Sequence, residues 1–539
     1  MKRDKRNIAD MLKLCACLCM FLLFVGCTAN QPEEVIETPT PTTMPAETYA
    51  RFMDNKLINN GDTIDLAIGE SREIIVSVNY ENNNSSNITI ADMLKCDIEY
   101  GDILSTHGTN DYKEFKEYAV ILSDKQDTDG FFHVKLTGKE AGTDDLKILA
   151  DDNEVFELKV NVLDETFEDK MSLELWQYPY SSMRYYITNW MDERHTTYLR
   201  NVLSKYKADG GSGLTISICD EPWGKQVYDA YPSMIRWYKD TNGNFYYDFS
   251  EFEQWIALGK ELGLTDKINA FSILPKYNRL GYYDLAMNAD QSLTLQPGSD
   301  DWKYIWGTFI DAFTWKCEEL GIYENVYICM DETDAEVMQD VVDLVRSHLN
   351  ANGDSFKLKA YFNYMPNLSC LDEFEDISLA ESILQDDNDK ALELINDRKE
   401  KGLTTTMYTC TNLYPNSFVY SIPAESTFSV VYAYAFGCDG FVRWALDAYT
   451  EDPYANVDNE FYESGDTLLV YPAQDLDVYE SMQYAAINEG RTLCARLAVH
   501  PDQSAVNAYL QNIRATKKNM SLDECRELVQ EGYDLVNGK

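Results

Sequence analysis

Histidine is scarce in this chain. The 539 residues include five histidines, which lie far apart at His107, His133, His195, His348 and His500. No two of them have the spacing of metal ligands. None falls at the end of a predicted strand in the part of the chain where strands and helices alternate. The sequence therefore argues against a Ser-His-Asp triad and a zinc site, and it leaves acid and base chemistry to carboxylates.

Positive charge is also in short supply. The chain has 46 Lys and Arg against 91 Asp and Glu, which gives a net charge of −45. A phosphate backbone is bound through Lys and Arg, so this balance argues against a nucleic-acid partner. The 13 cysteines include no CxxC pair, which excludes a zinc ribbon and a disulfide scaffold. Cys219, Cys329 and Cys410 fall in apolar runs and are predicted to be buried free thiols.

Long apolar runs are absent except near the N-terminus. Basic residues from Lys2 to Lys13 precede the apolar run 14–25, which is shorter than the about 20 residues of a membrane span. This pattern predicts a secretion signal. Its end, Phe24-Val25-Gly26-Cys27, resembles a bacterial lipobox, in which Cys27 is lipidated. We expect a protein anchored by lipid at the extracellular face of the bacterial cell membrane; an ordinary signal peptide and a released protein are the alternative.

The rest of the chain divides by composition. Residues 28–47 are rich in Pro and Thr and predict a disordered tether after the signal segment 1–27. Residues 48–165 contain DTIDLAI, REIIVSVNY, FFHVKLTG and VFELKVNVL, in which β-branched residues lie between turn residues. They predict an Ig-like β-sandwich. Residues 171–500 predict a catalytic barrel, and residues 501–539 predict a helical tail.

The predicted barrel rests on eight short apolar runs that alternate with amphipathic helical segments. In TYLRNVLSKY, for example, Tyr198, Leu199, Val202, Leu203 and Tyr206 share one face. Eight strand–helix units over this length favour a (β/α)8 TIM barrel over a doubly wound sheet, since no Gly-rich phosphate loop follows any strand. The predicted strands are 173–178, 214–220, 268–274, 326–332, 357–364, 377–384, 404–410 and 440–446.

Two adjacent carboxylates, Asp331 and Glu332, close the fourth of these strands. The following residues, Thr333 to Glu336, form a capping-box pattern, so helix capping alone is one interpretation. The other strand ends favour a second one, because barrel enzymes place their chemistry there. Aromatic faces with carboxylates and amides suit a sugar ring, and the candidate binding residues of this kind are Trp176, Asp220, Glu221, Trp223, Tyr277, Asn278, Tyr364, Tyr408, Trp444 and Asp447.

Neighbouring acids do not fit the common glycosidase scheme easily. That scheme places two carboxyls on opposite sides of the scissile bond, at about 5–5.5 Å for retention and farther apart for inversion. Adjacent residues of a strand point to opposite faces, so a twist at the strand end is needed for both to reach one pocket. Substrate-assisted catalysis accommodates them: the 2-acetamido oxygen attacks, one carboxylate orients the acetamide, and its neighbour protonates the leaving oxygen.

Several segments in the same order resemble glycoside hydrolase family 123. They are LELWQYPYSSMRYY (173–186), which holds the further candidate Arg184, SICDEPWGKQVYDAYPSMIRW (217–237), CMDE (329–332), GFVRWALDAY (440–449) and SGDTLLVYP (464–472). The resemblance implies a β-N-acetylgalactosaminidase with a (β/α)8 barrel behind a β-sandwich. It also implies that Asp331 stabilises the acetamide and that Glu332 is the general acid/base. Lys276-Tyr277 stands where the family pattern has a Trp near Pro275.

The sequence thus predicts an exo-β-N-acetylgalactosaminidase acting on a glycan with β-linked N-acetylhexosamine, without cofactor or metal. DTNGNFYYDFSE (240–251) nearly spells a calcium loop, but Phe245 stands where Gly is needed, and Asn242-Gly243 favours a type I′ hairpin. Two alternatives stay open. One is a glycosidase of other specificity with Glu221 or Asp447 as nucleophile. The other is a glycan-binding surface lipoprotein without activity.

Overall fold

The computed structural model describes residues 49–52, 57–77, 88–110, 113–121, 131–150, 153–409, 414–516, 518 and 520–539. By its contacts the chain divides into two units, 1–46 and 47–539, and the described residues all belong to the second. The predicted signal segment, Cys27, the tether and Cys410 lie outside the described residues. The other predicted thiols, Cys219 and Cys329, are buried and free.

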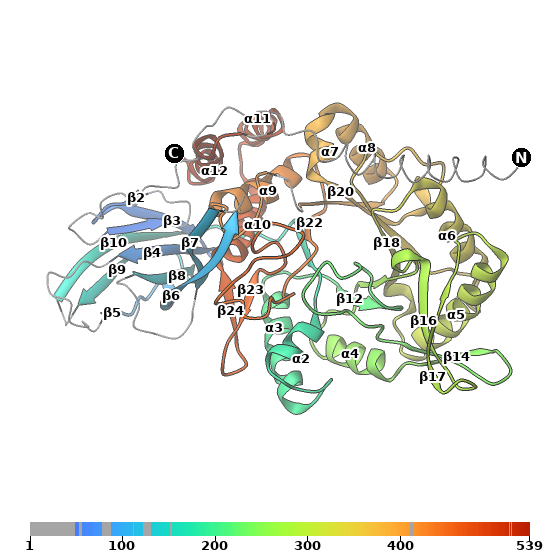
Figure 1. The fold of residues 1–539 in the computed structure, drawn as a ribbon. Coiled ribbons are helices and arrows are strands. Elements are labelled where there is room, and N and C mark those ends of the chain that lie inside the picture. The colour runs from blue at the N-terminus through green and yellow to red at the C-terminus, as the bar shows by residue number, and fades with distance from the viewer. Residues whose placement is uncertain are drawn as a thin grey trace, which may run out of the picture. The chain divides into compact units, whose positions relative to one another are not determined.

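The centre of the described unit is a parallel sheet of eight strands (Figure 1). All eight predicted strands are in it, and they alternate with helices along the chain. Its order is β11-β22-β21-β20-β19-β18-β15-β12. The bounds are β11 Ser172–Leu175, β12 Leu214–Ser217, β15 Ile268–Phe271, β18 Val326–Asp331, β19 Lys357–Phe362, β20 Asp376–Ala380, β21 Thr404–Tyr408 and β22 Gly440–Arg443.

The sheet is strongly curled. Lys267 precedes β15, yet its ammonium lies 2.9 Å from the carboxylate of Glu174 in β11. In a flat sheet β15 and β11 would be roughly 29 Å apart, six strand spacings of about 4.8 Å. The backbone N–H of Ser212, just before β12, also donates to Leu173 O of β11 at 2.7 Å. The two edge strands therefore approach each other, and the domain is TIM-barrel-like.

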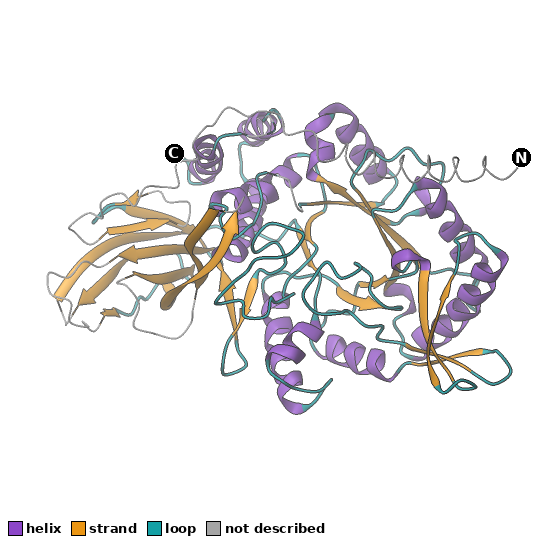
Figure 2. Cartoon of the chain, in the orientation of Figure 1, coloured by secondary structure: helices purple, strands orange, loops and turns teal. Residues whose placement is uncertain are grey.

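Helices lie outside the curled sheet (Figure 2). The predicted amphipathic segments form α3, α4 and α5, and Gly263 and Gly321 take the left-handed conformation just after α4 and α5. In the described residues no helix is both long and apolar enough to cross a bilayer. The bounds are α2 Pro179–Tyr185, α3 Glu193–Ala208, α4 Ser250–Glu261, α5 Asp300–Glu319, α6 Ala335–Ser347, α7 Glu381–Asp386, α8 Asn388–Glu400, α9 Pro423–Ala435, α10 Met482–Val499, α11 Gln503–Arg514 and α12 Leu522–Val536, with short 3-10 turns at Lys276–Asn278, Tyr323–Asn325 and Leu371–Glu373.

Three local predictions were wrong. Residues 381–384 belong to α7 and not to a strand. Helix α6 begins at Ala335, and its N-cap residue Asp334 makes no side-chain capping bond, so the predicted capping box does not form. Residues 478–481 begin the stretch 478–539, which is helical by its sequence pattern, yet they form strand β24. In each case neighbouring strands or helices decide the backbone, and the local pattern does not.

A small sheet of four strands, β14-β13-β16-β17, decorates the barrel. Its strands are β13 Arg236–Lys239, β14 Phe245–Asp248, β16 Arg279–Asp284 and β17 Ala289–Thr294. The near-calcium motif forms the predicted hairpin between β13 and β14. The turn is not type I′, because Gly243 has a positive φ of 91° and Asn242 does not. The Asp240 carboxylate accepts the N–H groups of Asn242 and Asn244 and so closes the turn.

The N-terminal part consists of two sheets with one shared apolar core. One has the order β3-β10-β9-β5, and the other has the order β2-β1-β4-β8-β6-β7-β24-β23. The Ig-like sandwich stays a prediction. The strand bounds are β1 Tyr49–Phe52, β2 Leu57–Ile58, β3 Thr63–Ala67, β4 Ser71–Ser77, β5 Ile88–Ile90, β6 Cys96–Asn110, β7 Lys113–Ile121, β8 Phe131–Gly138, β9 Gly142–Ala150, β10 Asn153–Leu163, β23 Val470–Pro472 and β24 Val478–Ser481.

Strand pairing and ion pairs join these sheets to the barrel. Strand β24 follows the last barrel strand in sequence, and it pairs with β7. The guanidinium of Arg496, on α10, lies 2.9 Å from the buried carboxylate of Glu70. Glu489, also on α10, accepts the backbone N–H of Glu73. Helix α10 is therefore a barrel helix that also contacts the N-terminal sheets.

Candidate active site

A pocket of about 590 Å³, including the space at its mouth, lies at the carboxyl ends of the barrel strands. It holds six of the predicted site residues: Trp176, Trp223, Asp331, Glu332, Tyr408 and Trp444. It also holds five residues that the sequence did not single out: Gln226, Tyr361, Val442, Tyr462 and Asp466.

Both carboxyls reach this pocket because the backbone leaves the strand conformation at Glu332. Asp331 is the last residue of β18 and pairs with Tyr361 of β19. Glu332 has a φ of 44°, in the left-handed region, where a non-glycine residue carries strain of about 1–3 kcal/mol. Its N–H donates to Tyr361 O at 3.1 Å. In a regular strand the two side chains would lie on opposite faces of the sheet. The left-handed conformation of Glu332 breaks this alternation.

Two side chains from neighbouring strand ends hold Glu332. The hydroxyl of Tyr408, at the end of β21, donates to Oε1 at 2.7 Å. The amide of Asn363, just after β19, donates to Oε2 at 2.8 Å. Both carboxylate oxygens therefore have a donor, and the side chain is held in one orientation at the rim of the pocket. Such fixed orientation is required of a group that transfers a proton.

Asp331 has a different environment. Its side chain is exposed to the space of the pocket, although protein surrounds it on the other sides. Burial, and then the neighbouring Glu332 carboxylate, raise the pKa of Asp331 from its ordinary value near 3.8 to about 8; Lys276 and the Trp223 indole act in the opposite direction.

Aromatic rings form most of the remaining wall. Trp176 and Trp223 stack at a centroid distance of 5.1 Å. Trp223 Nε1 is buried, and its N–H interacts with the Asp331 carboxyl, whose pKa it lowers. Trp444 packs edge-on against Tyr462, with centroids 5.3 Å apart. Rings of this kind pack against the apolar face of a sugar.

Asp466 is a site residue that sequence reasoning missed. It lies in the segment 464–472, and it is buried at 1% exposure. Its Oδ2 accepts from Trp444 Nε1 at 3.1 Å, and its Oδ1 lies 2.7 Å from the buried guanidinium of Arg443. The motif SGDTLLVYP was the available signal, but no strand-end position marked its Asp. Gln226 and Tyr361 likewise lie within segments already singled out, and their side-chain directions depend on tertiary packing.

Seven predicted binding residues do not line the pocket. Two of them, Arg184 and Asp447, have structural partners. Arg184 binds Asp229 at 2.8 Å and the carbonyls of Tyr449 and Thr450. Asp447 is buried and accepts the N–H of Tyr178 at 2.8 Å, and burial raises its pKa to about 7.

The other five lie in the loops around the pocket. Asp220 accepts the N–H of Ser233. Glu221 has a φ of 48°, and burial raises its pKa. Tyr277 and Asn278 are consecutive left-handed residues, and Tyr277 is 82% exposed. Tyr364 donates to Thr333 O. In the described residues no cluster of His, Cys, Asp and Glu could hold a metal ion.

Comparison with known proteins agrees with this geometry. The family model for the glycoside hydrolase 123 catalytic domain matches residues 176–499, more than half of the chain. A solved family 123 glycoside hydrolase from Clostridium perfringens, analysed for the details of glycolipid glycan hydrolysis, is 26% identical. The match covers 91% of this chain and 97% of that chain, with a TM-score of 0.80.

Other solved structures match more distantly. A protein from Bacteroides vulgatus, proposed to be a glycoside hydrolase, is 11% identical over 75% of each chain with a TM-score of 0.33. An endo-β1,6-glucanase is 15% identical over 60% of this chain and 76% of its own, with a TM-score of 0.37. At these TM-scores neither carries an argument. No curated protein sequence matches the chain.

Fold, pocket and comparisons together define a glycoside hydrolase. The chain belongs to glycoside hydrolase family 123. The family resemblance found in the sequence is thereby confirmed.

The raised pKa of Asp331 gives a prediction about stability. The folded protein keeps this proton up to about pH 8, and the unfolded chain loses it near pH 4, so Asp331 makes the wild type less stable as pH rises between these values. Asp331→Asn has no such group. We expect its melting temperature, relative to that of the wild type, to rise steadily from pH 5 to pH 8.

Glu332→Gln is the matched control. It removes the negative charge next to Asp331, which lowers the pKa of Asp331. The pH range in which the folded protein keeps a proton that the unfolded chain has lost is therefore narrower. Melting curves of the three proteins at four pH values measure this. A constant difference between Asp331→Asn and wild type across the range would contradict the prediction.

Proposed function

We propose that this glycoside hydrolase is an exo-β-N-acetylgalactosaminidase that uses the 2-acetamido group of its substrate as the nucleophile. The observation that carries the proposal is the position of the two acids. Asp331 and Glu332 are adjacent in sequence and line one pocket from one strand end. The hydrolysis of glycolipid glycans named for the Clostridium perfringens relative supports a glycan as the substrate class, and the family resemblance implies β-linked N-acetylhexosamine at its end.

The roles follow from the two environments. The Asp331 carboxylate accepts the acetamide N–H and turns the acetamide oxygen toward the anomeric carbon. As that oxygen forms its bond to the carbon, the glycosidic bond breaks, and Glu332 gives its proton to the leaving oxygen. Glu332 then takes a proton from a water that attacks the same carbon and opens the oxazolinium ring. Two displacements retain the anomeric configuration.

Substrate binding also changes the protonation state of Asp331. In the empty pocket the raised pKa keeps a proton on Asp331 at neutral pH. A bound acetamide N–H donates to the ionised form of Asp331 and therefore favours it. The correct sugar therefore favours the ionised form of Asp331, which is the form that holds the acetamide.

The remaining pocket acid argues against a protein nucleophile. Asp466 is the third carboxylate among the described residues that line the pocket, and its two oxygens bind Arg443 and Trp444. The nucleophile candidates of the alternative mechanism, Glu221 and Asp447, do not line the pocket. A nucleophile supplied by the substrate accounts for a pocket whose other two acids, Asp331 and Glu332, are neighbours in sequence.

The proposed setting is the extracellular face of the bacterial membrane, with a lipid on Cys27, the tether 28–47 and an Ig-like sandwich before the barrel. The support is the sequence pattern Phe24-Val25-Gly26-Cys27. Cys27→Ser removes the thiol that would be lipidated. We expect the wild type in the detergent-extracted membrane fraction of the producing cells and the variant outside it; equal membrane fractions would contradict the anchor.

A panel of aryl β-glycosides of N-acetylgalactosamine, N-acetylglucosamine and galactose tests the reaction. We expect hydrolysis of the acetamido sugars only, with the galactosamine preferred, because galactose lacks the nucleophile. Hydrolysis of the β-galactoside would place the nucleophile on the protein. Binding of these sugars without any turnover would favour the glycan-binding alternative.

The acid variants separate the two roles. Glu332→Gln is expected to lose about 10²–10⁴-fold of kcat/KM on a natural disaccharide and much less on a nitrophenyl glycoside, whose leaving group needs little acid help. Asp331→Asn is expected to lose activity on both, because it disturbs the nucleophile. Steady-state kinetics on both substrates measure this. Equal losses for Glu332→Gln on the two substrates would exclude it as the acid.

A further inference from the structure

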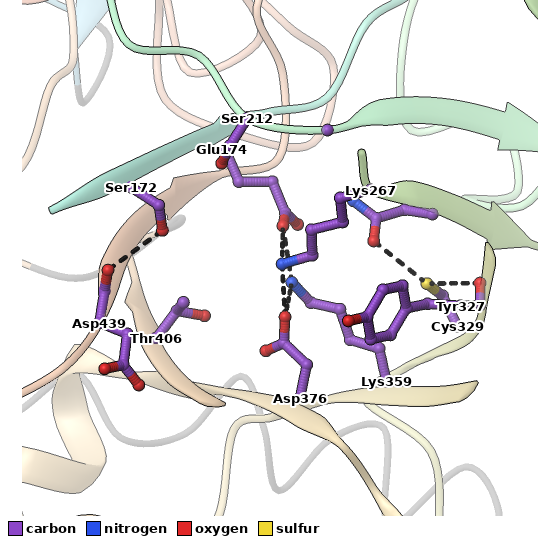
Figure 3. A network of polar contacts seen from close by, with 12 residues as sticks. Ser172, Glu174, Ser212, Lys267, Tyr327, Cys329, Lys359, Asp376, Thr406 and Asp439 are labelled. Atoms are coloured by element: carbon purple, nitrogen blue, oxygen red, sulfur yellow. Dashed lines mark hydrogen bonds and ion pairs between the residues drawn. The ribbon is translucent and has the colours of Figure 1, made fainter. Parts of the chain in front are cut away.

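Four charged side chains meet inside the curled sheet (Figure 3). Glu174 of β11 lies 2.6 Å from the ammonium of Lys359, on β19, and 2.9 Å from that of Lys267. Asp376 of β20 lies 3.1 Å from Lys359 and also pairs with Lys267. Two positive and two negative charges balance, which allows the cluster to persist where Glu174, Lys359 and Asp376 are almost fully buried.

Glu174 is ionised in this cluster. Burial alone would raise its pKa, but Lys267 and Lys359 outweigh burial, and the pKa stays below its ordinary value. Oε2 faces the two ammonium groups. Oε1 points the other way, toward the pocket end of the barrel.

Two pocket aromatics donate to this second oxygen. The hydroxyl of Tyr361 lies 2.5 Å from Oε1, and the indole Nε1 of Trp176 lies 3.3 Å from it. Both rings line the pocket, and they meet edge to face at 4.9 Å. Hydrogen bonds to an ionised acceptor are stronger than neutral ones and fix direction as well as distance. The Glu174 carboxylate therefore fixes two side chains of the pocket wall, Trp176 and Tyr361.

Tyr361 also connects the cluster to the acid pair. Its carbonyl accepts the Glu332 N–H, and its backbone pairs with Asp331. Its ring lies edge-on to Tyr408, whose hydroxyl binds Glu332. The tilt of the Tyr361 ring is therefore set from one end by the Asp331 strand and from the other by Glu174. A change at Glu174 reaches the pocket through this ring and through Trp176.

We propose that Glu174 is a positioning residue: held by Lys267 and Lys359, its carboxylate fixes Trp176 and Tyr361 as the inner wall against which the sugar ring packs. Asp376 belongs to the same cluster, but in the described residues the Trp176 N–H and the Tyr361 hydroxyl donate to Glu174 and not to Asp376. The expected effect on KM rests on the proposed function, whereas the expected effect on the positions of the two rings does not.

The test compares Glu174→Gln with Asp376→Asn in the full chain. Each removes one negative charge from the same cluster, so each is expected to lower the melting temperature. The wall binds the sugar alike in ground state and transition state, so its loss raises KM and leaves kcat nearly unchanged. We expect about a tenfold higher KM for aryl β-N-acetylgalactosaminide with Glu174→Gln and less than about a twofold change with Asp376→Asn, both assayed well below their melting temperatures.

Tyr361→Phe keeps the proposal testable if Glu174→Gln does not fold. It removes the hydroxyl that donates to Glu174 and keeps the ring and all four charges. We expect a higher KM and a smaller drop in melting temperature than Glu174→Gln causes, because one hydrogen bond to the buried carboxylate is lost while the cluster keeps its charge balance. An unchanged KM for Tyr361→Phe, or equal changes for Glu174→Gln and Asp376→Asn, would overturn the proposal.

A readout without substrate separates this proposal from the proposed function. Near-ultraviolet circular dichroism reports the surroundings of Trp and Tyr rings in the folded protein. We expect Glu174→Gln to change this spectrum and Asp376→Asn to preserve it, whether or not any hexosaminide is cleaved. A wild type without activity would overturn the proposed function alone; an unaltered spectrum for Glu174→Gln would overturn the positioning role alone.

Discussion

The site depends on one backbone contact, the hydrogen bond from Glu332 N–H to Tyr361 O at 3.1 Å. It keeps β18 attached to β19 for one residue beyond the regular strand, while Glu332 turns into the left-handed region. Without that turn the strand alternation would direct one of the two acids away from the pocket. The strain of this residue is offset by the strand pairing before it and by the two side-chain donors, Tyr408 and Asn363, that hold its carboxylate.

Once the two acids share a pocket, their electrostatics follow. Burial, and then the neighbouring Glu332 carboxylate, raise the pKa of Asp331. The proposed reaction needs one acid that accepts a hydrogen bond and one that donates a proton. In that proposal the acetamido N–H of a hexosamine donates to Asp331, so the substrate itself distinguishes the two acids.

The polar interior of the barrel serves the same pocket. TIM-barrel interiors are usually filled with branched apolar side chains. Here Glu174, Lys267, Lys359 and Asp376 occupy part of that space, and the cluster carries its own neutralising charges. An apolar layer could fill the same volume, but it could not accept hydrogen bonds from Trp176 and Tyr361. The charged layer therefore gives direction to aromatic rings that would otherwise be held by packing alone.

The sequence by itself determined the order of strands and helices and the positions of Asp331 and Glu332, because hydrophobic period and strand-end position are local properties. It also indicated the family through several short segments in order. Tertiary structure alone decided which strand-end residues share the pocket: Trp176 and Tyr408 line it, whereas Arg184 and Asp447 have structural partners, and Asp466 enters from a loop with no strand-end signal. The physical reason is that side-chain direction depends on the curl of the sheet and on neighbours distant in sequence, as the contact between Lys267 and Glu174 shows.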